Sequence, residues 1–134
     1  MSQENVDAFK RGLDAYNRRD VDAMLELWTP DVVLDWSNAR NFDAGVFQGH
    51  DEVRAFTKLW LETWEAIRLE LPSDPVEVQD DVLVVENVAY MRGRDGIEVQ
   101  ARSAWLITMR GRKVASFTLY QTKQEALEAA GLSE

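Results

Sequence analysis

The sequence has 134 residues, with no cysteine and a single histidine, His50. The lack of cysteine excludes disulfides, thiolate metal sites and cysteine nucleophiles. One histidine cannot build the usual His/Cys zinc site, and a Ser-His-Asp triad would have to use that residue. Because His50 stands at the start of an expected helix, we interpret it as a capping residue, with catalysis as the alternative, and we expect no metal.

Several other features are missing. The sequence has no glycine-rich phosphate loop, no nucleophile elbow, no His-Glu-x-x-His and no EF-hand loop, so we expect no cofactor. No apolar run approaches the roughly 20 residues of a membrane-spanning helix. Glu4 and Asp7 stand where a signal peptide would need an apolar stretch. We therefore expect a cytoplasmic protein with no membrane partner.

Positive charge is also scarce. Lys and Arg number 15 against 24 Asp and Glu, which gives a net charge of −9. This balance would repel a phosphate backbone, so binding to nucleic acid and to anionic membranes is disfavoured. The remaining composition, 46% hydrophobic and 29% charged, is that of an ordinary globular chain. The length fits one domain over residues 1–134.

Hydrophobic spacing predicts an α+β order of elements. Helices are expected over about 3–18, 20–29, 49–67 and 122–131, and strands over 31–36, 67–78, 82–92, 97–109 and 113–121. Asp20 is typical of a helix N-cap, and Thr122 with Glu125 forms a capping box. Asp95-Gly96 between two alternating runs predicts a tight hairpin. The sequence therefore predicts helices packed on one face of a curved antiparallel sheet, with a pocket between them.

The third helix carries a large aromatic face. Its apolar positions are Val53, Phe56, Leu59, Trp60, Thr63, Trp64 and Ile67. Ordinary core packing explains such a face, and so does the wall of a ligand cavity. Both interpretations stay open at this point.

The turns suggest which strand residues share a face. A two-residue loop at Asp95-Gly96 places Glu86 opposite Trp105 and Tyr90 opposite Ala101, and a two-residue loop at Arg110-Gly111 extends that face to the next strand. The residues grouped in this way are Val84, Glu86, Val88, Tyr90, Ser103, Trp105, Ile107, Ser116, Thr118 and Tyr120. A β-bulge would move later residues to the other face.

Two carboxylates are candidate catalytic residues. Glu86 interrupts a valine-rich strand, and an aromatic setting would raise the pKa of its carboxyl group toward the range useful for proton transfer. A salt bridge at a wet rim is the alternative. Asp35 ends the first strand beside Trp36 and could equally be a surface or loop-capping acid. Tyr16, Tyr90 and Tyr120 could donate hydrogen bonds to a polarised oxygen, or could make structural hydrogen bonds in the core.

Three strings resemble the SnoaL-like family of the nuclear transport factor 2-like superfamily. They are Ala15-Tyr16-Asn17-Arg18-Arg19-Asp20, Phe47-Gln48-Gly49-His50-Asp51-Glu52-Val53-Arg54 and Glu125-Ala126-Leu127-Glu128-Ala129-Ala130-Gly131-Leu132. The resemblance implies a cone-shaped α+β barrel, also called cystatin-like, with a pocket between the sheet and the long helix. It further implies a homodimer packed through the sheet. Relatives include ketosteroid isomerase and polyketide cyclases, which are mostly cofactor-free.

The match to the family's catalytic positions is poor. Close SnoaL-like sequences often carry a histidine where this chain has Trp105. The basic aspartate of the isomerases falls at or beside Asp35-Trp36, and their oxyanion-binding acid falls near Trp105, which argues against isomerase chemistry of that type. Fold does not fix function.

We therefore expect a pocket for a small apolar or aromatic molecule. If the protein is an enzyme, Asp35 or Glu86 would move a proton. The ligand would be bound by Tyr16, Trp36, Trp60, Trp64, Tyr90, Ser103, Trp105 and Tyr120. The alternative is a non-catalytic dimer that carries a ligand or binds a partner.

Overall fold

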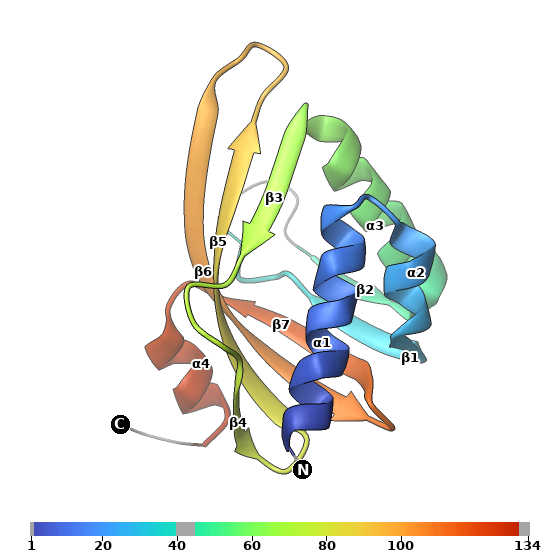
Figure 1. The fold of residues 1–134 in the computed structure, drawn as a ribbon, viewed down its shortest axis with the longest axis vertical. Helices are drawn as coiled ribbons and strands as arrows, with labels where there is room; N and C mark the ends of the chain where they lie inside the picture. Colours follow the sequence, from blue (N-terminus) through green and yellow to red (C-terminus); the bar gives the residue numbers. More distant parts are fainter. Residues whose placement is uncertain (1, 40–44, 132–134) are drawn as a thin grey trace.

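A computed structural model describes residues 2–39 and 45–131 and consists of four helices and seven strands within those ranges (Figure 1). The helices are α1 (Ser2–Asn17), α2 (Val21–Glu26), α3 (Gly49–Thr63) and α4 (Lys123–Ala129). The strands are β1 (Trp28–Asp35), β2 (Val46–Gln48), β3 (Ala66–Glu70), β4 (Val76–Gln79), β5 (Val82–Arg92), β6 (Glu98–Arg110) and β7 (Lys113–Tyr120). The predicted α+β class is confirmed, but the sheet is not wholly antiparallel, because β1 pairs with β7 in parallel.

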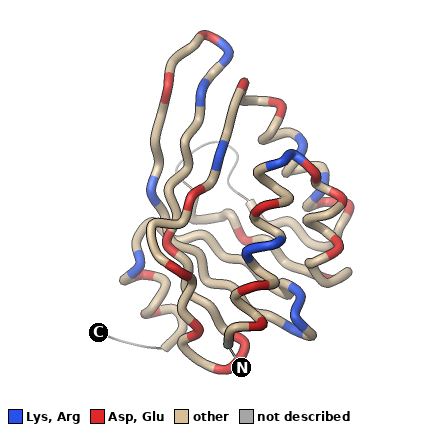
Figure 2. The backbone as a smooth tube through the Cα atoms, viewed as in Figure 1, with Lys and Arg blue, Asp and Glu red and all other residues tan. Residues whose placement is uncertain are grey.

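The strands form one curved, unclosed sheet in the order β2-β1-β7-β6-β5-β3, with β4 also paired to β5. Helices α1 to α3 lie on one side of this sheet and α4 lies on the other, while the β5–β6 hairpin extends beyond the helices as an arm (Figure 1). We call the side toward α1 and α3 the inner face and the side toward α4 the outer face. Charged residues lie on the helices, on the turns and along β3, β5 and β6 (Figure 2).

Each face of the sheet has its own apolar cluster. The inner face packs Leu83, Val85, Trp105 and Ile107 with Phe9 of α1, and all five are buried. The outer face packs a smaller cluster of Val84 and Ala104 under Ala126 of α4. A strand that alternates between two apolar layers explains why β5 reads as a nearly continuous hydrophobic run.

The expected caps are present. The Asp20 carboxylate accepts a hydrogen bond from the Ala23 backbone N–H at 3.1 Å, which satisfies one free donor of α2. Thr122 Oγ1 accepts from the Glu125 N–H at 3.1 Å, while the Glu125 carboxylate accepts from the Gln121 N–H at 2.9 Å. A capping box is predicted at this place. The Glu125 carboxylate bonds the N–H of Gln121, one residue before the N-cap Thr122, instead of the N–H of Thr122 itself.

Several element boundaries differ from the prediction. Residues 28–30 continue β1 instead of ending the second helix, so Trp28 lies on a strand. The run expected over 67–78 divides into β3 and β4, and β2 was not predicted at all. On α3, Leu59 is 55% exposed, whereas Thr57 and Leu61 are buried, so the buried stripe is rotated from the expected one. Residues 40–44, between the strand expected over 31–36 and the helix expected from residue 49, lie outside the described residues.

The predicted register of the β5–β6 hairpin is wrong by one residue. Glu86 pairs with Ala104, and Trp105 pairs with Val85. The loop has three residues, Arg94-Asp95-Gly96, because the Gly96 N–H bonds the Gly93 carbonyl at 2.9 Å and Gly96 takes a φ of 89°. A type I turn followed by a left-handed glycine is the usual three-residue hairpin. A slip of one residue turns every side chain of β5 to the other face relative to β6.

The predicted register of the β6–β7 hairpin is also wrong. The turn residues are Gly111-Arg112, both at positive φ, and the pairing shifts again between Thr108 and Met109. Trp105 therefore pairs with Leu119 instead of lying beside Ser116. The inner-face residues of the three strands are Leu83, Val85, Asn87, Ala89, Met91, Ser103, Trp105, Ile107, Phe117 and Leu119, as their pairing gives them.

Candidate functional site

A cavity of about 340 Å³ lies between the inner face of the sheet and helices α1 and α3. All five tryptophans of the chain, Trp28, Trp36, Trp60, Trp64 and Trp105, line it. Its other aromatic residues are Phe9, Tyr16, Phe56 and Phe117. The volume is at the lower end of the range of small-molecule sites, and the predominantly apolar wall is typical of them.

The aromatic rings form two connected groups. Along α3, the Phe56 ring stacks on Trp60 with centroids 6.3 Å apart, and Trp60 meets Trp64 edge-on at 6.2 Å. On the sheet, Trp105 lies 4.8 Å from Phe117 and 6.0 Å from Phe9. Both interpretations of the α3 aromatic face therefore hold together, since these rings pack against the core and also bound the cavity.

Polar atoms form the smaller part of the cavity wall, although eleven of the described lining residues carry one in the side chain. Among the described lining residues they belong to Tyr16, Trp28, Trp36, Thr57, Trp60, Trp64, Asn87, Arg102, Ser103, Trp105 and Gln121. Asn87 is buried and its Nδ2 donates to Ser103 Oγ at 2.6 Å. Its Oδ1 and the indole Nε1 atoms of Trp64 and Trp105 are buried without a hydrogen-bond partner among the described residues.

Tyr16 is a neutral group at any ordinary pH. Burial raises the pKa of its phenol above the usual value of 10.0, and the nearby Arg19 guanidinium offsets only part of that effect. The hydroxyl therefore keeps its proton and offers a hydrogen-bond donor to the cavity. It is a weak acid for proton transfer.

The raised pKa predicts a change in stability at alkaline pH. A pKa raised by folding contributes stability that is complete below about pH 10 and is lost as the pH rises toward the folded-state value. Tyr16→Phe should therefore lose less free energy of unfolding than the wild type between about pH 9 and about pH 11. Urea denaturation at both pH values measures this, with Tyr90→Phe on the outer face as control. Equal losses in wild type and Tyr16→Phe would contradict the prediction.

The structure separates the two candidate carboxylates from the cavity. Glu86 is half-buried beside Ala104 on the outer face, so the expected contact with Trp105 does not exist. Asp35 pairs with Thr118 at the end of β1, and its carboxylate accepts bonds from the Ser37 N–H and hydroxyl at 3.0 and 2.6 Å. Neither is among the residues that line the cavity. Glu86 lies away from the cavity because the observed register of the β5–β6 hairpin pairs it with Ala104 on the outer face.

Six of the eight predicted ligand-binding residues line the cavity, and two do not. Tyr16, Trp36, Trp60, Trp64, Ser103 and Trp105 line the cavity. Tyr90 and Tyr120 do not: the Tyr90 ring lies under the Arg68 guanidinium at 5.2 Å, and Tyr120 packs with the α4 cluster. The sequence prediction does not include Asn87 among the ligand-binding residues. Asn87 is a lone amide within a valine-rich strand, but the wrong register places its neighbour Glu86, and not Asn87, on the cavity side.

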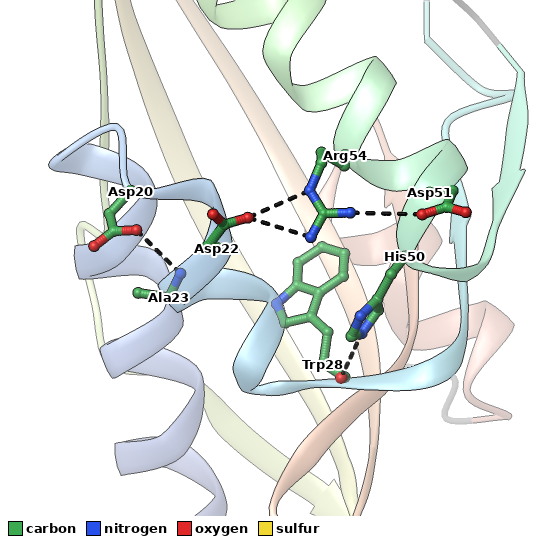
Figure 3. A network of polar contacts seen from close by, with 7 residues as sticks. All are labelled: Asp20, Asp22, Ala23, Trp28, His50, Asp51 and Arg54. Atoms are coloured by element: carbon green, nitrogen blue, oxygen red, sulfur yellow. Dashed lines mark hydrogen bonds and ion pairs between the residues drawn. The ribbon is translucent and has the colours of Figure 1, made fainter.

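His50 does not line the cavity but connects α3 to β1 through a hydrogen bond. Its Nε2–H donates to the Trp28 carbonyl at 2.9 Å, which ties α3 to the strand that carries the Trp28 ring (Figure 3). On the next turn of α3, the Arg54 guanidinium bonds Asp22 of α2 at 3.2 Å and lies 3.6 Å from Asp51 (Figure 3). The capping role expected for His50 is wrong, since Gln48 is the N-cap and donates its N–H to Glu52.

A curved sheet around helices, with an apolar cavity between them, defines a class of small α+β folds to which several solved structures belong. TerC, co-crystallised with polyporic acid, aligns with a TM-score of 0.78 and 20% identity over 94% of this chain and 97% of that chain. An NTF2-like protein of unknown function from Burkholderia pseudomallei aligns with 0.77 and 21% over 96% and 97%. Rv0760c from Mycobacterium tuberculosis, in complex with estradiol-17β-hemisuccinate, aligns with 0.76 and 13% over 89% and 94%.

At these identities the structural likeness shows the fold alone. The family model of the SnoaL-like domain matches residues 9–117, so the chain belongs to the SnoaL-like domain family. The resemblance seen in the sequence is thereby confirmed. No curated protein matches the sequence. No helix among the described residues is long and apolar enough to cross a membrane.

Proposed function

We propose that this chain binds a neutral, largely aromatic or apolar small molecule in the cavity between the inner face, α1 and α3. The observation that carries the proposal is the convergence of all five tryptophans on one cavity of about 340 Å³. Burying flat apolar surface against such a wall is favourable. Two neighbours of the same fold, TerC and Rv0760c, have crystal structures with polyporic acid and with estradiol-17β-hemisuccinate.

The proposal is for binding and does not extend to proton transfer. No carboxylate and no histidine stands among the lining residues within 2–39 and 45–131. Tyr16, the one lining tyrosine of the described chain, holds its proton because burial raises its pKa. A wall of this kind orients a ligand through its shape and a few hydrogen bonds.

Intrinsic fluorescence tests the proposal directly, because every tryptophan of the chain lines the cavity. Titration with 2-naphthol and with estradiol should quench tryptophan emission saturably and raise the melting temperature, since a ligand that binds only the folded state stabilises it. Naphthalene-1,3,6-trisulfonate, a charged molecule with the same ring system, should do neither. If 2-naphthol and estradiol both fail to give saturable quenching, the proposal is wrong.

We also propose that the chain forms a homodimer through the outer face of the sheet. Helix α4 covers the part of this face around Val84 and Ala104, while Tyr90 and Leu106 are half-buried on the same face. Sedimentation equilibrium at micromolar concentration should give twice the chain mass of 15.4 kDa. The mass of a single chain would contradict the dimer and leave the binding proposal intact.

A further inference from the structure

The inner face of the sheet carries one hydrogen-bonded polar pair at the cavity wall; the charged Arg102 of β6 also lines the cavity, but it pairs with Val88 and alternates to the outer face. Asn87 of β5 and Ser103 of β6 are directly opposite each other in the antiparallel ladder, and both line the cavity. The Asn87 amide donates to the Ser103 hydroxyl oxygen at 2.6 Å, and Asn87 is 3% exposed. Their neighbours on the inner face are Val85, Ala89 and Trp105, so the pair is surrounded by apolar surface.

The pair is incompletely satisfied. Asn87 Oδ1 is buried with no hydrogen-bond partner in the described part of the chain. If the amide is turned over, the Ser103 hydroxyl bonds Oδ1 and the NH₂ group is left alone, so one end of the amide lacks a partner in either orientation. A buried polar group without a partner is costly, and native structures keep few of them.

We propose that the Asn87–Ser103 pair is the polar recognition point of the cavity and selects ligands that bear a neutral hydroxyl group. This inference rests on the proposed binding function and names the ligand chemistry of the same site. A hydroxyl both donates and accepts, so it can complete the pair whichever end of the amide is free.

The chemistry of the pair explains why the selected group is neutral. An amide and a hydroxyl are dipoles without net charge, and burying an ionised group beside them costs more than their hydrogen bonds return. The indole Nε1–H of Trp105, two residues from Ser103 on the same strand face, is likewise buried without a partner among the described residues. It is a second neutral donor on that part of the wall. The selected ligand therefore combines a flat apolar body with a hydroxyl directed at β5 and β6.

Two probes of the same shape test the selection. 2-Naphthol carries the hydroxyl, and 2-methylnaphthalene replaces it with a methyl group. The measured quantity is the ratio of the dissociation constant of 2-methylnaphthalene to that of 2-naphthol, determined by isothermal titration calorimetry. In Asn87→Leu, which has a similar size and no hydrogen-bonding group, this ratio should fall by roughly tenfold, about the effect of leaving one buried polar group unpaired. Ser103→Ala should lower it in the same direction.

A matched control is available on the other side of the sheet. Thr108 and Ser116 form a hydroxyl pair 2.6 Å apart across β6 and β7, and neither lines the cavity. Ser116→Ala removes that cross-strand bond and should leave the ratio unchanged. Without ligand, Asn87→Leu removes the unsatisfied amide end but also takes away the hydrogen-bond partner of the Ser103 hydroxyl, so its stability should be close to that of the wild type.

The outcomes separate this inference from the binding function. A lower ratio in Asn87→Leu and Ser103→Ala, with no change in Ser116→Ala, supports the selection. An unchanged ratio while both probes still bind overturns the selection and keeps the binding function. If Asn87→Leu does not fold, Ser103→Ala alone decides between these results. If neither these two probes nor estradiol binds the wild type, the binding function and the selection are overturned together.

Discussion

Ala89→Trp is expected to abolish binding of 2-naphthol while the chain still folds. Ala89 lies on β5 opposite Ala101, and both small side chains line the cavity. An indole built at this position would project from the inner face and occupy much of the 340 Å³. We expect the affinity to fall by roughly 100-fold, about 2.7 kcal/mol of binding free energy. The measurement is the fluorescence titration, calibrated for the added tryptophan.

The control places the same side chain on the opposite face of the same arm. Gln100 is exposed on β6 and pairs with Tyr90, away from the cavity. Gln100→Trp should bind 2-naphthol as the wild type does. Melting curves for both variants establish that they are folded, since overpacking costs roughly 1–3 kcal/mol at most sites. If Ala89→Trp binds with unchanged affinity, 2-naphthol occupies some other surface and the cavity is not the binding site.

The sequence predicted the architecture well because its local signals agree with one another. Asp20 caps α2, Thr122 caps α4, and the alternating run over residues 82–92 is β5 with the same bounds. Each of these signals acts within a few residues, so it does not depend on the rest of the fold. Trp60 and Trp64 follow the helical period of α3, which brings them to the same wall.

The error in the predicted faces of β5 and β6 came from the register. Asp95-Gly96 was interpreted as a two-residue turn, but Arg94 joins the loop, and nothing in the composition of the two strands opposes either choice. Both faces of β5 are apolar, so the usual hydrophobic pattern that fixes a register is weak there. Because the predicted register is displaced by one residue, the prediction places Glu86 on the cavity side and Asn87 on the opposite side, the reverse of the observed arrangement. The bulge after Thr108 has no sequence signature that we can identify.

Trp105→Ala is expected to lose about 3–5 kcal/mol of the free energy of unfolding, the range for deleting a large buried aromatic. Trp105 is 2% exposed and contacts the rings of Phe9 and Phe117. Typical domains are stable by about 5–15 kcal/mol, so this variant would have little stability left. Urea denaturation followed by circular dichroism measures the loss without relying on the deleted fluorophore.

Trp60→Ala is the comparison variant for Trp105→Ala. Trp60 also lines the cavity, but it is half-buried, and its deletion should cost less than about 2 kcal/mol because less apolar surface is lost. The Nε1 atom of Trp105 is buried without a hydrogen-bond partner among the described residues, so its removal offsets part of the stability lost in Trp105→Ala. A clear difference between the variants means that the sheet side of the cavity is a rigid part of the core and that α3 supplies the adaptable side. Equal losses would mean that Trp105 is as loosely packed as Trp60, and the fixed position of Ser103 beside it would then lose its physical basis.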